Sequence, residues 1–315
     1  MRILVTGATG FIGASLTRRL LHDGHEVHIF TRLESNRWRL FDLLPHLEEH
    51  DLDLRDADRV EMVINQVRPE VIFHLATYGG FAYQDETSAI ICSNFNGTIN
   101  LLKACIRGGF ELFVNTGSSS EYGIKSEPMR ESDLLEPLND YGVAKAAATL
   151  YCRSEAVRLK LPVVTYRLFS PYGPWDDPKR LIPYTLSMLL RKESPRLANP
   201  SAVRDFIFID DVIEAYMRAL TGSIAPGEIY NVGSGRQHSI AEVVGIICEL
   251  VEGVTNPCWG VRDMQRPEPA IWVADVRKIN GALDWTPSIA LKEGLARTAE
   301  WMRDHMECYP GDKTI

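Results

Sequence analysis

The sequence has no long apolar run, no excess of positive charge and no closely paired cysteines. Acidic side chains outnumber basic ones and the formal net charge is -8, so nucleic acid is not an expected partner. No segment approaches the roughly 20 apolar residues that cross a bilayer, and Met1 runs into a short apolar stretch without a signal-peptide pattern. We therefore expect a cytoplasmic protein with neither a nucleic-acid nor a membrane partner.

The six cysteines stand far apart in the sequence, and none belongs to a Cys-x-x-Cys pair. A Cys-x-x-Cys pair is typical of structural zinc sites and of redox dithiols. We interpret the cysteines as reduced thiols and expect no metal site.

The chain does contain a regular alternation of short β-branched runs and longer helical patterns. Apolar runs at residues 3–5, 27–30, 71–73, 112–114 and 163–165 predict strands, and helical patterns cover 11–22, 60–66, 93–108 and 141–160. Strands that alternate with helices indicate crossover connections. The sequence therefore predicts an α/β fold of the Rossmann type, a doubly wound parallel sheet with helices on both faces.

The pattern loosens after Leu168, where six prolines fall between positions 171 and 200. Such a segment is expected to leave the sheet and to build a smaller α/β lobe that binds the substrate. We predict a dinucleotide-binding domain over residues 1–168, which residues 205–232 rejoin. The substrate-binding lobe then comprises residues 169–204 and 233–315.

Three glycines follow the first predicted strand and open the first predicted helix. Gly7 would permit the tight turn, Gly10 would let backbone amides approach a pyrophosphate, and Gly13 would allow close packing of helix on strand. The amides at Phe11 and Ile12 then lie at the helix N-terminus, which favours an anion. The segment predicts a binding site for a nicotinamide dinucleotide.

The second predicted strand ends at Thr31 and Arg32, where NAD-specific folds place an acidic residue. A hydroxyl and a guanidinium, with Arg37 and Arg39 close behind, suit a 2'-phosphate instead. The sequence favours NADP(H) as cofactor. An ordinary solvated basic loop would leave NAD(H) open.

Tyr141 and Lys145 are four residues apart in a helical pattern, so their side chains share a face. The lysine ammonium would stabilise the phenolate form of Tyr141, which could then exchange a proton with a substrate oxygen. Ser118 follows another predicted strand and would project into the crevice at the carboxyl ends of the sheet. We predict Ser118, Tyr141 and Lys145 as catalytic residues, with Tyr141 and Lys145 also contacting the dinucleotide.

With these motifs, the chain resembles the extended short-chain dehydrogenase/reductase family, which includes nucleotide-sugar epimerases, 4,6-dehydratases and 4-keto-sugar reductases. The resemblance extends to nearly the whole chain. It implies a homodimer and a nucleotide-diphosphate sugar as the partner. It further implies cofactor contacts from Asp53, Leu54, Leu75, Ala76, Thr77 and Asn94.

The resemblance also places substrate contacts in the second lobe and beside the catalytic serine. Arg204 and Arg266 match arginines that hold the diphosphate of a nucleotide sugar, although an arginine before an aspartate could equally be a structural ion pair. Ser119 and Ser120 stand beside Ser118, and Ser170 replaces the asparagine that usually contacts substrate.

One departure bears on the reaction. Dehydratases of the family carry a glutamate where this chain has Ser120, so 4,6-dehydration is disfavoured unless a one-residue shift brings Glu121 into use. We expect reduction of a 4-keto-(6-deoxy)-sugar nucleotide, with a nucleotide-sugar epimerase that retains NAD as the alternative. A dehydratase and a non-catalytic dinucleotide sensor are the remaining hypotheses.

Overall fold

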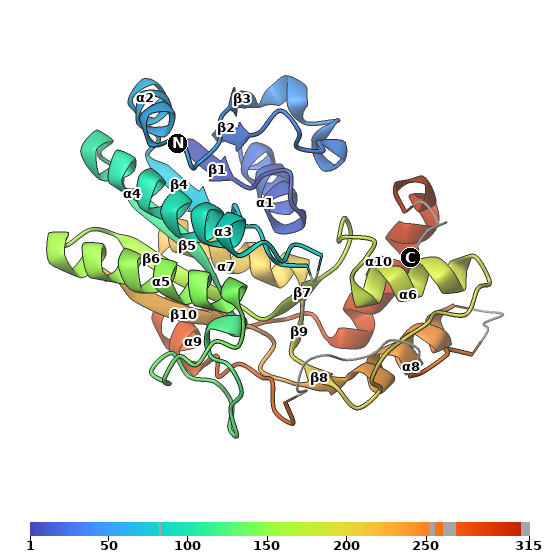
Figure 1. The fold of residues 1–315 in the computed structure, drawn as a ribbon. Helices are drawn as coiled ribbons and strands as arrows, with labels where there is room; N and C mark the ends of the chain where they lie inside the picture. The colour runs from blue at the N-terminus through green and yellow to red at the C-terminus, as the bar shows by residue number, and fades with distance from the viewer. Residues whose placement is uncertain (82, 252–255, 261–268, 310–315) are drawn as a thin grey trace.

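The computed structural model describes residues 1–81, 83–251, 256–260 and 269–309. Its centre is a seven-stranded sheet in the order β10-β6-β5-β4-β1-β2-β3, and every pair of neighbouring strands is parallel (Figure 1). The strands are β1 (Arg2–Thr6), β2 (Glu26–Thr31), β3 (Glu48–Asp51), β4 (Val71–His74), β5 (Leu112–Ser118), β6 (Val163–Leu168) and β10 (Glu228–Val232).

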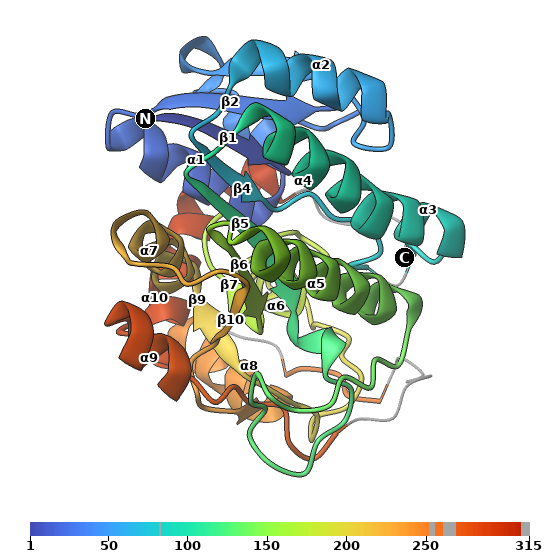
Figure 2. The ribbon, with the colours of Figure 1, turned by 90° about the vertical axis from the view of Figure 1, so that its left-hand side faces the viewer.

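Helices cover both faces of this sheet. Helices α1 (Phe11–His22) and α7 (Ile209–Thr221) contact each other on one face. The other face carries α2 (Ala57–Val67), α4 (Gly97–Gly108) and α5 (Asp140–Leu159), which lie side by side in Figure 2. The predicted doubly wound α/β fold is confirmed. The strand order reverses between β1 and β4, and such a reversal opens a crevice at the carboxyl ends of the strands.

The loop-rich part of the chain builds a second group of elements beyond those carboxyl ends (Figure 1). Two small sheets pair β7 with β9 and β8 with β11. These elements are β7 (Ser170–Tyr172), α6 (Leu181–Leu190), β8 (Val203–Arg204), β9 (Phe206–Phe208), β11 (His238–Ser239), α8 (Ile240–Leu250) and α10 (Leu291–Asp304). Helix α9 (Arg277–Leu283) instead packs against β10 of the large sheet. The assignment of residues to two lobes stays a prediction.

Burial of apolar residues and helix capping explain why β6 and α5 lie where the sequence predicts them. All six residues of β6 are buried, as expected of an inner strand in a parallel sheet. Helix α5 begins after Asn139, whose side chain accepts a hydrogen bond from Gly142 N at 2.8 Å, a standard N-cap.

Two elements differ from the expectation because their sequences carry no apolar signal of the right kind. Strand β3 reads Glu-Glu-His-Asp and lies at the edge of the sheet, so no β-branched run announces it. The helix predicted over 93–108 is instead α3 (Thr87–Ile91), a turn of π-helix (Cys92–Asn96) and α4. A π-turn of this kind is frequent at functional sites.

Candidate active site

The glycine loop joins β1 to α1 at the point where the strand order reverses. Gly7 has a φ of +71°, and a β-carbon there would lie 2.6 Å from Ala76 N. A β-carbon on Gly13 would collide with the carbonyl oxygen of Gly7. Gly10 is the N-cap of α1, and no acidic residue stands in the first turn. This bare helix N-terminus fits an anionic diphosphate, because it presents free amides and the positive end of the helix dipole.

A buried chain of polar side chains runs beneath the loop through His74. Burial and the Lys145 ammonium lower the pKa of His74 to about 3, so its ring is neutral. Thr98 Oγ1 donates to the Asn94 carbonyl at 2.6 Å, which leaves it to accept from His74 Nε2 at 2.8 Å. His74 Nδ1 then accepts from Thr6 Oγ1 at 2.7 Å, and Thr6 Oγ1 accepts from Ala76 N at 3.3 Å. This series of hydrogen bonds fixes one tautomer of His74 and holds the segment after β4 in place.

Asn94 stands in the π-turn and secures the same segment from the other side. Its amide oxygen accepts from Thr77 Oγ1 at 3.0 Å and from Tyr78 N at 2.9 Å, and its Nδ2 donates to Tyr78 O at 2.6 Å. Both acceptor sites of the amide oxygen and one of the two Nδ2 donors are used by these contacts. Asn94 therefore positions residues 77 and 78 instead of facing the crevice.

The serine segment at the end of β5 forms a tight turn. Ser118 Oγ accepts from Ser120 N at 3.1 Å, and Ser118 N donates to Glu121 Oε1 at 2.9 Å. Glu121 is fully buried, and its Oε2 accepts from Arg167 Nε at 2.7 Å. The Arg167 Nη1 also donates to Tyr122 Oη at 3.0 Å. Glu121 thus supports the turn from inside the protein and is not a free acid at the crevice.

Tyr141 lies in the first turn of α5 and Lys145 one turn later. Lys145 is 5% exposed, and its Nζ donates to Thr116 O at 2.9 Å. An ammonium has three donors, so two remain for a ligand. The Tyr141 hydroxyl makes no hydrogen bond to any residue that the structure describes. Both side chains are available to a bound molecule.

One cavity of about 780 Å³ collects most of the predicted site residues. Its lining includes Gly7, Gly10, Phe11, Ile12, Gly13, Leu75, Thr77, Ser118, Ser119, Ser120, Tyr141, Lys145, Ser170 and Arg204. Thr31, Arg32, Asp53, Leu54, Ala76 and Asn94 are not part of this lining. The catalytic candidates and the glycine loop therefore share one space.

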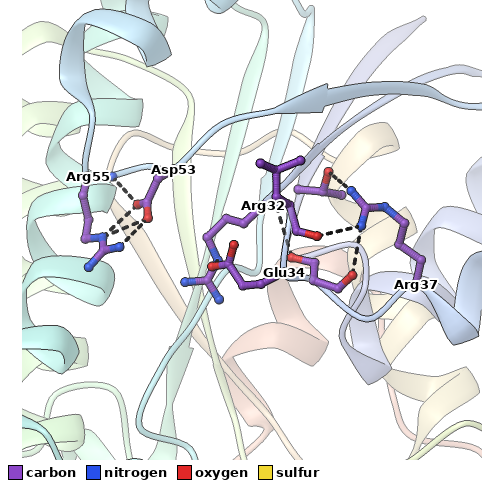
Figure 3. A network of polar contacts seen from close by, with 8 residues as sticks. Arg32, Glu34, Arg37, Asp53 and Arg55 are labelled. Atoms are coloured by element: carbon purple, nitrogen blue, oxygen red, sulfur yellow. Dashed lines mark hydrogen bonds and ion pairs between the residues drawn. The ribbon is translucent and has the colours of Figure 1, made fainter.

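Thr31, Arg32, Asp53 and Leu54 lie at or just after the carboxyl ends of β2 and β3. Figure 3 shows Arg32 beside Glu34, with 3.3 Å between Nε and Oε1, and Asp53 paired with Arg55 at 2.6 Å. The Arg55 guanidinium is the main cause that lowers the pKa of Asp53. Leu54 packs against Gly97 at the start of α4.

The hydroxyl of Thr31 is also committed within the protein. Thr31 Oγ1 donates to Glu49 Oε1 at 2.6 Å, and Arg37 Nε lies 2.5 Å from the same oxygen. Arg37 Nη2 donates to Thr31 Oγ1 at 3.3 Å. The donors that would suit a 2'-phosphate thus already face carboxylates, which were not foreseen because β3 was not predicted.

Arg39 does not join this basic loop. It lies in a short 3-10 helix, Trp38–Leu40, and turns toward the glycine loop, where it lines the large cavity. Asp176 and Arg180 also line that cavity. The sequence placed Arg39 in the basic loop after β2 and did not name Arg180, and the folded chain brings both to this cavity.

Ser170 and Arg204, which the sequence predicts as substrate contacts, both line the large cavity. Both also line a neighbouring cavity of about 280 Å³, together with Asp176 and Arg180. Arg204 Nη1 donates to Val203 O at 2.7 Å. Arg266 lies outside the described residues.

Asp205, which follows Arg204 in the sequence, is buried among backbone amides. Its carboxylate accepts from Ser234 N at 2.7 Å, Gly235 N at 3.1 Å and Ala274 N at 2.9 Å. Asp205 is therefore the structural acceptor for three backbone amides that come from two loops.

Together, the glycine loop, the cavity and the Ser118, Tyr141 and Lys145 side chains define a dinucleotide-binding protein of the Rossmann class with a candidate catalytic centre at the switch point. The sequence profile of the NAD dependent epimerase/dehydratase family matches residues 3–233, and the chain belongs to this family. No helix among the described residues is long and apolar enough to span a membrane.

Individual relatives cover almost the whole chain. A UDP-glucose 4-epimerase of Mycolicibacterium smegmatis is 30% identical over 96% of this chain and 99% of its own length. A mouse dTDP-D-glucose 4,6-dehydratase is 27% identical over 96% of this chain and 88% of its own. The structure of a UDP-glucuronic acid 4-epimerase of Bacillus cereus in complex with UDP-glucuronic acid and NAD has a TM-score of 0.85, 26% identity, and coverage of 97% of this chain and 100% of its own.

Proposed function

We propose that this protein is an NAD(H)-dependent 4-epimerase of a UDP-sugar. The observation that carries the proposal is the polar turn at the cavity. Ser118, Ser119 and Ser120 face the cavity together with Tyr141, whereas the nearby acid, Glu121, is buried against Arg167. A 4,6-dehydratase needs an acid at the reacting sugar, and these hydroxyls do not supply one.

The environment of β2 supports NAD(H) over the NADP(H) that the sequence favoured. Glu34 and Glu49 lie beside Arg32 and Arg37, with ion-pair distances of 3.3 Å and 2.5 Å. A dianionic 2'-phosphate would have to compete with these carboxylates, while a neutral 2'-hydroxyl can donate to one. The relative from Bacillus cereus was also solved with NAD. With NAD(H) as the proposed cofactor, the main reason for expecting a net reduction with NADPH is removed.

The dinucleotide, when bound, supplies a hydride acceptor and donor at C4 of the sugar. Tyr141 would take the proton of the C4 hydroxyl during oxidation and return a proton to that oxygen during reduction, once the 4-keto sugar has turned its opposite face to the cofactor. Ser118 lines the same cavity and can donate to the reacting oxygen. Lys145, held by Thr116 O at 2.9 Å, has two further donors that would hold the ribose of the cofactor.

The test begins with the purified protein. Small molecules released on denaturation are identified by mass spectrometry, and the native protein is incubated with UDP-glucose and with UDP-glucuronic acid without added cofactor. We expect NAD in the released fraction and conversion of one of these sugars to its C4 epimer. Consumption of NADPH with a nucleotide 4-keto-sugar, without any epimerisation, would instead establish the reductase. Failure of both assays would favour a non-catalytic sensor.

We further propose a homodimer that forms through α5. Val143, Leu150 and Val157 are 49%, 52% and 57% exposed, and their spacing of seven residues places them along one side of the helix. An apolar stripe of this kind on an exposed helix is typical of a surface that packs against a second copy.

A further inference from the structure

Arg39 is a buried cation at the glycine loop. Its side chain and backbone together are 7% exposed, and it lines the large cavity beside Gly10 and Phe11. The guanidinium packs over the ring of Trp38, 4.3 Å from the ring centroid. Arg39 is therefore buried and still faces the cavity that the N-terminus of α1 lines.

The hydrogen bonds of Arg39 leave part of its guanidinium unused. Nε donates to Trp175 O at 2.6 Å, and Nη1 donates to Thr9 O at 3.3 Å. Nη2 has no hydrogen-bond partner among the residues that the structure describes. A guanidinium has five N–H donors, so at least two stay available.

No carboxylate among the described residues lies within ion-pair distance of Arg39, in contrast to its neighbour Arg18. Burial lowers the pKa of Arg39, and the charges of Asp177 and Asp176 offset this only in part. A guanidinium remains charged in proteins, so the group is a buried positive charge without a counterion. Such a charge is costly unless a bound anion compensates it.

We propose that Arg39 binds the diphosphate of the dinucleotide, opposite the amides at the N-terminus of α1. The planar guanidinium can offer two parallel N–H donors to phosphate oxygens, and the helix end supplies amides to others. The inference rests on the proposed dinucleotide-dependent function and assigns the diphosphate a side-chain ligand in addition to the glycine loop.

The assignment also gives Arg39 a place between cofactor and substrate. Its Nε holds the carbonyl of Trp175, a residue with a φ of +71°, and Asp176 comes next in the wall of the large cavity. A diphosphate bound to Arg39 would therefore contact the side chain that also holds the Trp175 carbonyl, next to Asp176 in the cavity wall.

The experiment compares ligands with and without a diphosphate on protein freed of endogenous dinucleotide. Calorimetry measures the binding of NAD, ADP-ribose and adenosine to the wild type and to Arg39→Met, Arg39→Lys and Arg18→Met. For Arg39→Met we expect affinity for NAD and ADP-ribose to fall about 10- to 100-fold, as for loss of a charged hydrogen bond. Adenosine should bind within about twofold of wild type, and Arg39→Lys should lie between.

Arg18→Met is the matched control. Arg18 packs over the ring of Trp175 at 4.5 Å in the same cluster, but it pairs with Asp42 and does not line the cavity. Its loss removes the same charge from the same region, so it should leave the ratio of ADP-ribose to adenosine affinity unchanged.

Two results would overturn the inference. If Arg39 only braces Trp175 and Thr9, Arg39→Met lowers the melting temperature of the ligand-free protein and leaves the affinity ratio at the wild-type value. If the wild type binds neither NAD nor ADP-ribose, the proposed function fails and the inference with it. Wild-type binding with an unchanged ratio in Arg39→Met rejects the role of Arg39 alone.

Discussion

Tyr141 and Lys145 line the cavity and keep hydrogen-bonding groups that the rest of the protein does not occupy. The Tyr141 hydroxyl has no hydrogen bond to the described residues, and Lys145 spends one of three donors on Thr116 O. Residues that stabilise the fold nearby behave differently, since Glu121 and Arg167 satisfy each other at 2.7 Å. Polar groups left available beside an anion site are what a catalytic centre requires.

Replacement of Tyr141 by phenylalanine removes the hydroxyl that is proposed to carry the proton and keeps the aromatic ring. We expect kcat for epimerisation to fall by about 100- to 10,000-fold, the usual contribution of a general acid/base. The NAD content of the purified protein should remain that of the wild type. A variant that keeps most of its turnover would show that another group moves the proton.

Asp176 provides a test of pH-dependent stability. It is 1% exposed, and burial raises its pKa to about 7. The folded protein therefore holds a proton at pH 4 to 7 that the unfolded chain releases, so this stability is present at low pH and is lost as the pH rises. Asp176→Asn removes the effect. In urea unfolding of the cofactor-free protein, the variant should gain about 1.4 kcal/mol on the wild type for each pH unit across this range.

The control for this experiment is Asp304→Asn, which changes an exposed carboxylate at the end of α10. It should follow the wild-type curve at every pH. His74 titrates in the opposite sense, because its pKa is lowered to about 3, but it does so equally in both proteins and cancels from the difference. A constant difference between Asp176→Asn and the wild type would contradict the prediction.

Sequence motifs could identify the residues whose roles depend on local order. Gly7, Gly10 and Gly13 announce the loop through their spacing after a strand, and Tyr141 and Lys145 through helical periodicity. Arg39 was instead predicted to contact a 2'-phosphate, because its place at the glycine loop depends on contacts across 136 residues, as between Arg39 and Trp175. Long-range contacts of this kind leave no periodic pattern in sequence.

At the scale of elements, helix α5 carries Tyr141, the proposed general acid/base, in its first turn, directly after the Asn139 cap. We expect Asn139→Ala to cost about 1 kcal/mol of stability and to lower kcat, because fraying of this turn displaces Tyr141. Asn139→Ser should restore both, since serine also caps. Urea unfolding and steady-state kinetics provide the two measurements.

Ser239→Ala serves as the comparison, since Ser239 caps α8 by accepting a hydrogen bond from Glu242 N at 3.1 Å, away from Tyr141. A similar loss of stability with an unchanged kcat is expected for it. Equal effects of Asn139→Ala and Ser239→Ala on kcat would show that the Asn139 cap does not act on kcat through Tyr141.

The elements that the sequence failed to predict share a cause. Strand β3 consists of polar residues and is held by its pairing with β2, from His28↔Glu48 to Thr31↔Asp51, so tertiary pairing overrides a weak local pattern. Because β3 was not foreseen, neither was the contact from Glu49 to Thr31. The preference for NADP(H) followed from reading the end of β2 without its neighbour.

At the scale of the whole molecule, the stripe on α5 predicts the oligomeric state. Leu150→Lys places a charge at the middle of the proposed interface and should convert the dimer to a monomer in light scattering coupled to gel filtration. Leu134→Lys changes a residue that is 73% exposed elsewhere and should not. A monomeric wild type would reject the interface.

The position of β10 at the end of the sheet order has a consequence for synthesis. Strand β10 pairs with β6, yet 59 residues separate Leu168 from Glu228, and the whole excursion through α6 and α7 lies between them. A nascent chain that has emerged only as far as β6 thus exposes an edge of buried β-branched residues, Val163 and Val164, with nothing beside it. Translation must pass residue 232 before that edge closes, so we expect the ribosome-bound intermediate to expose an unpaired strand edge that can aggregate.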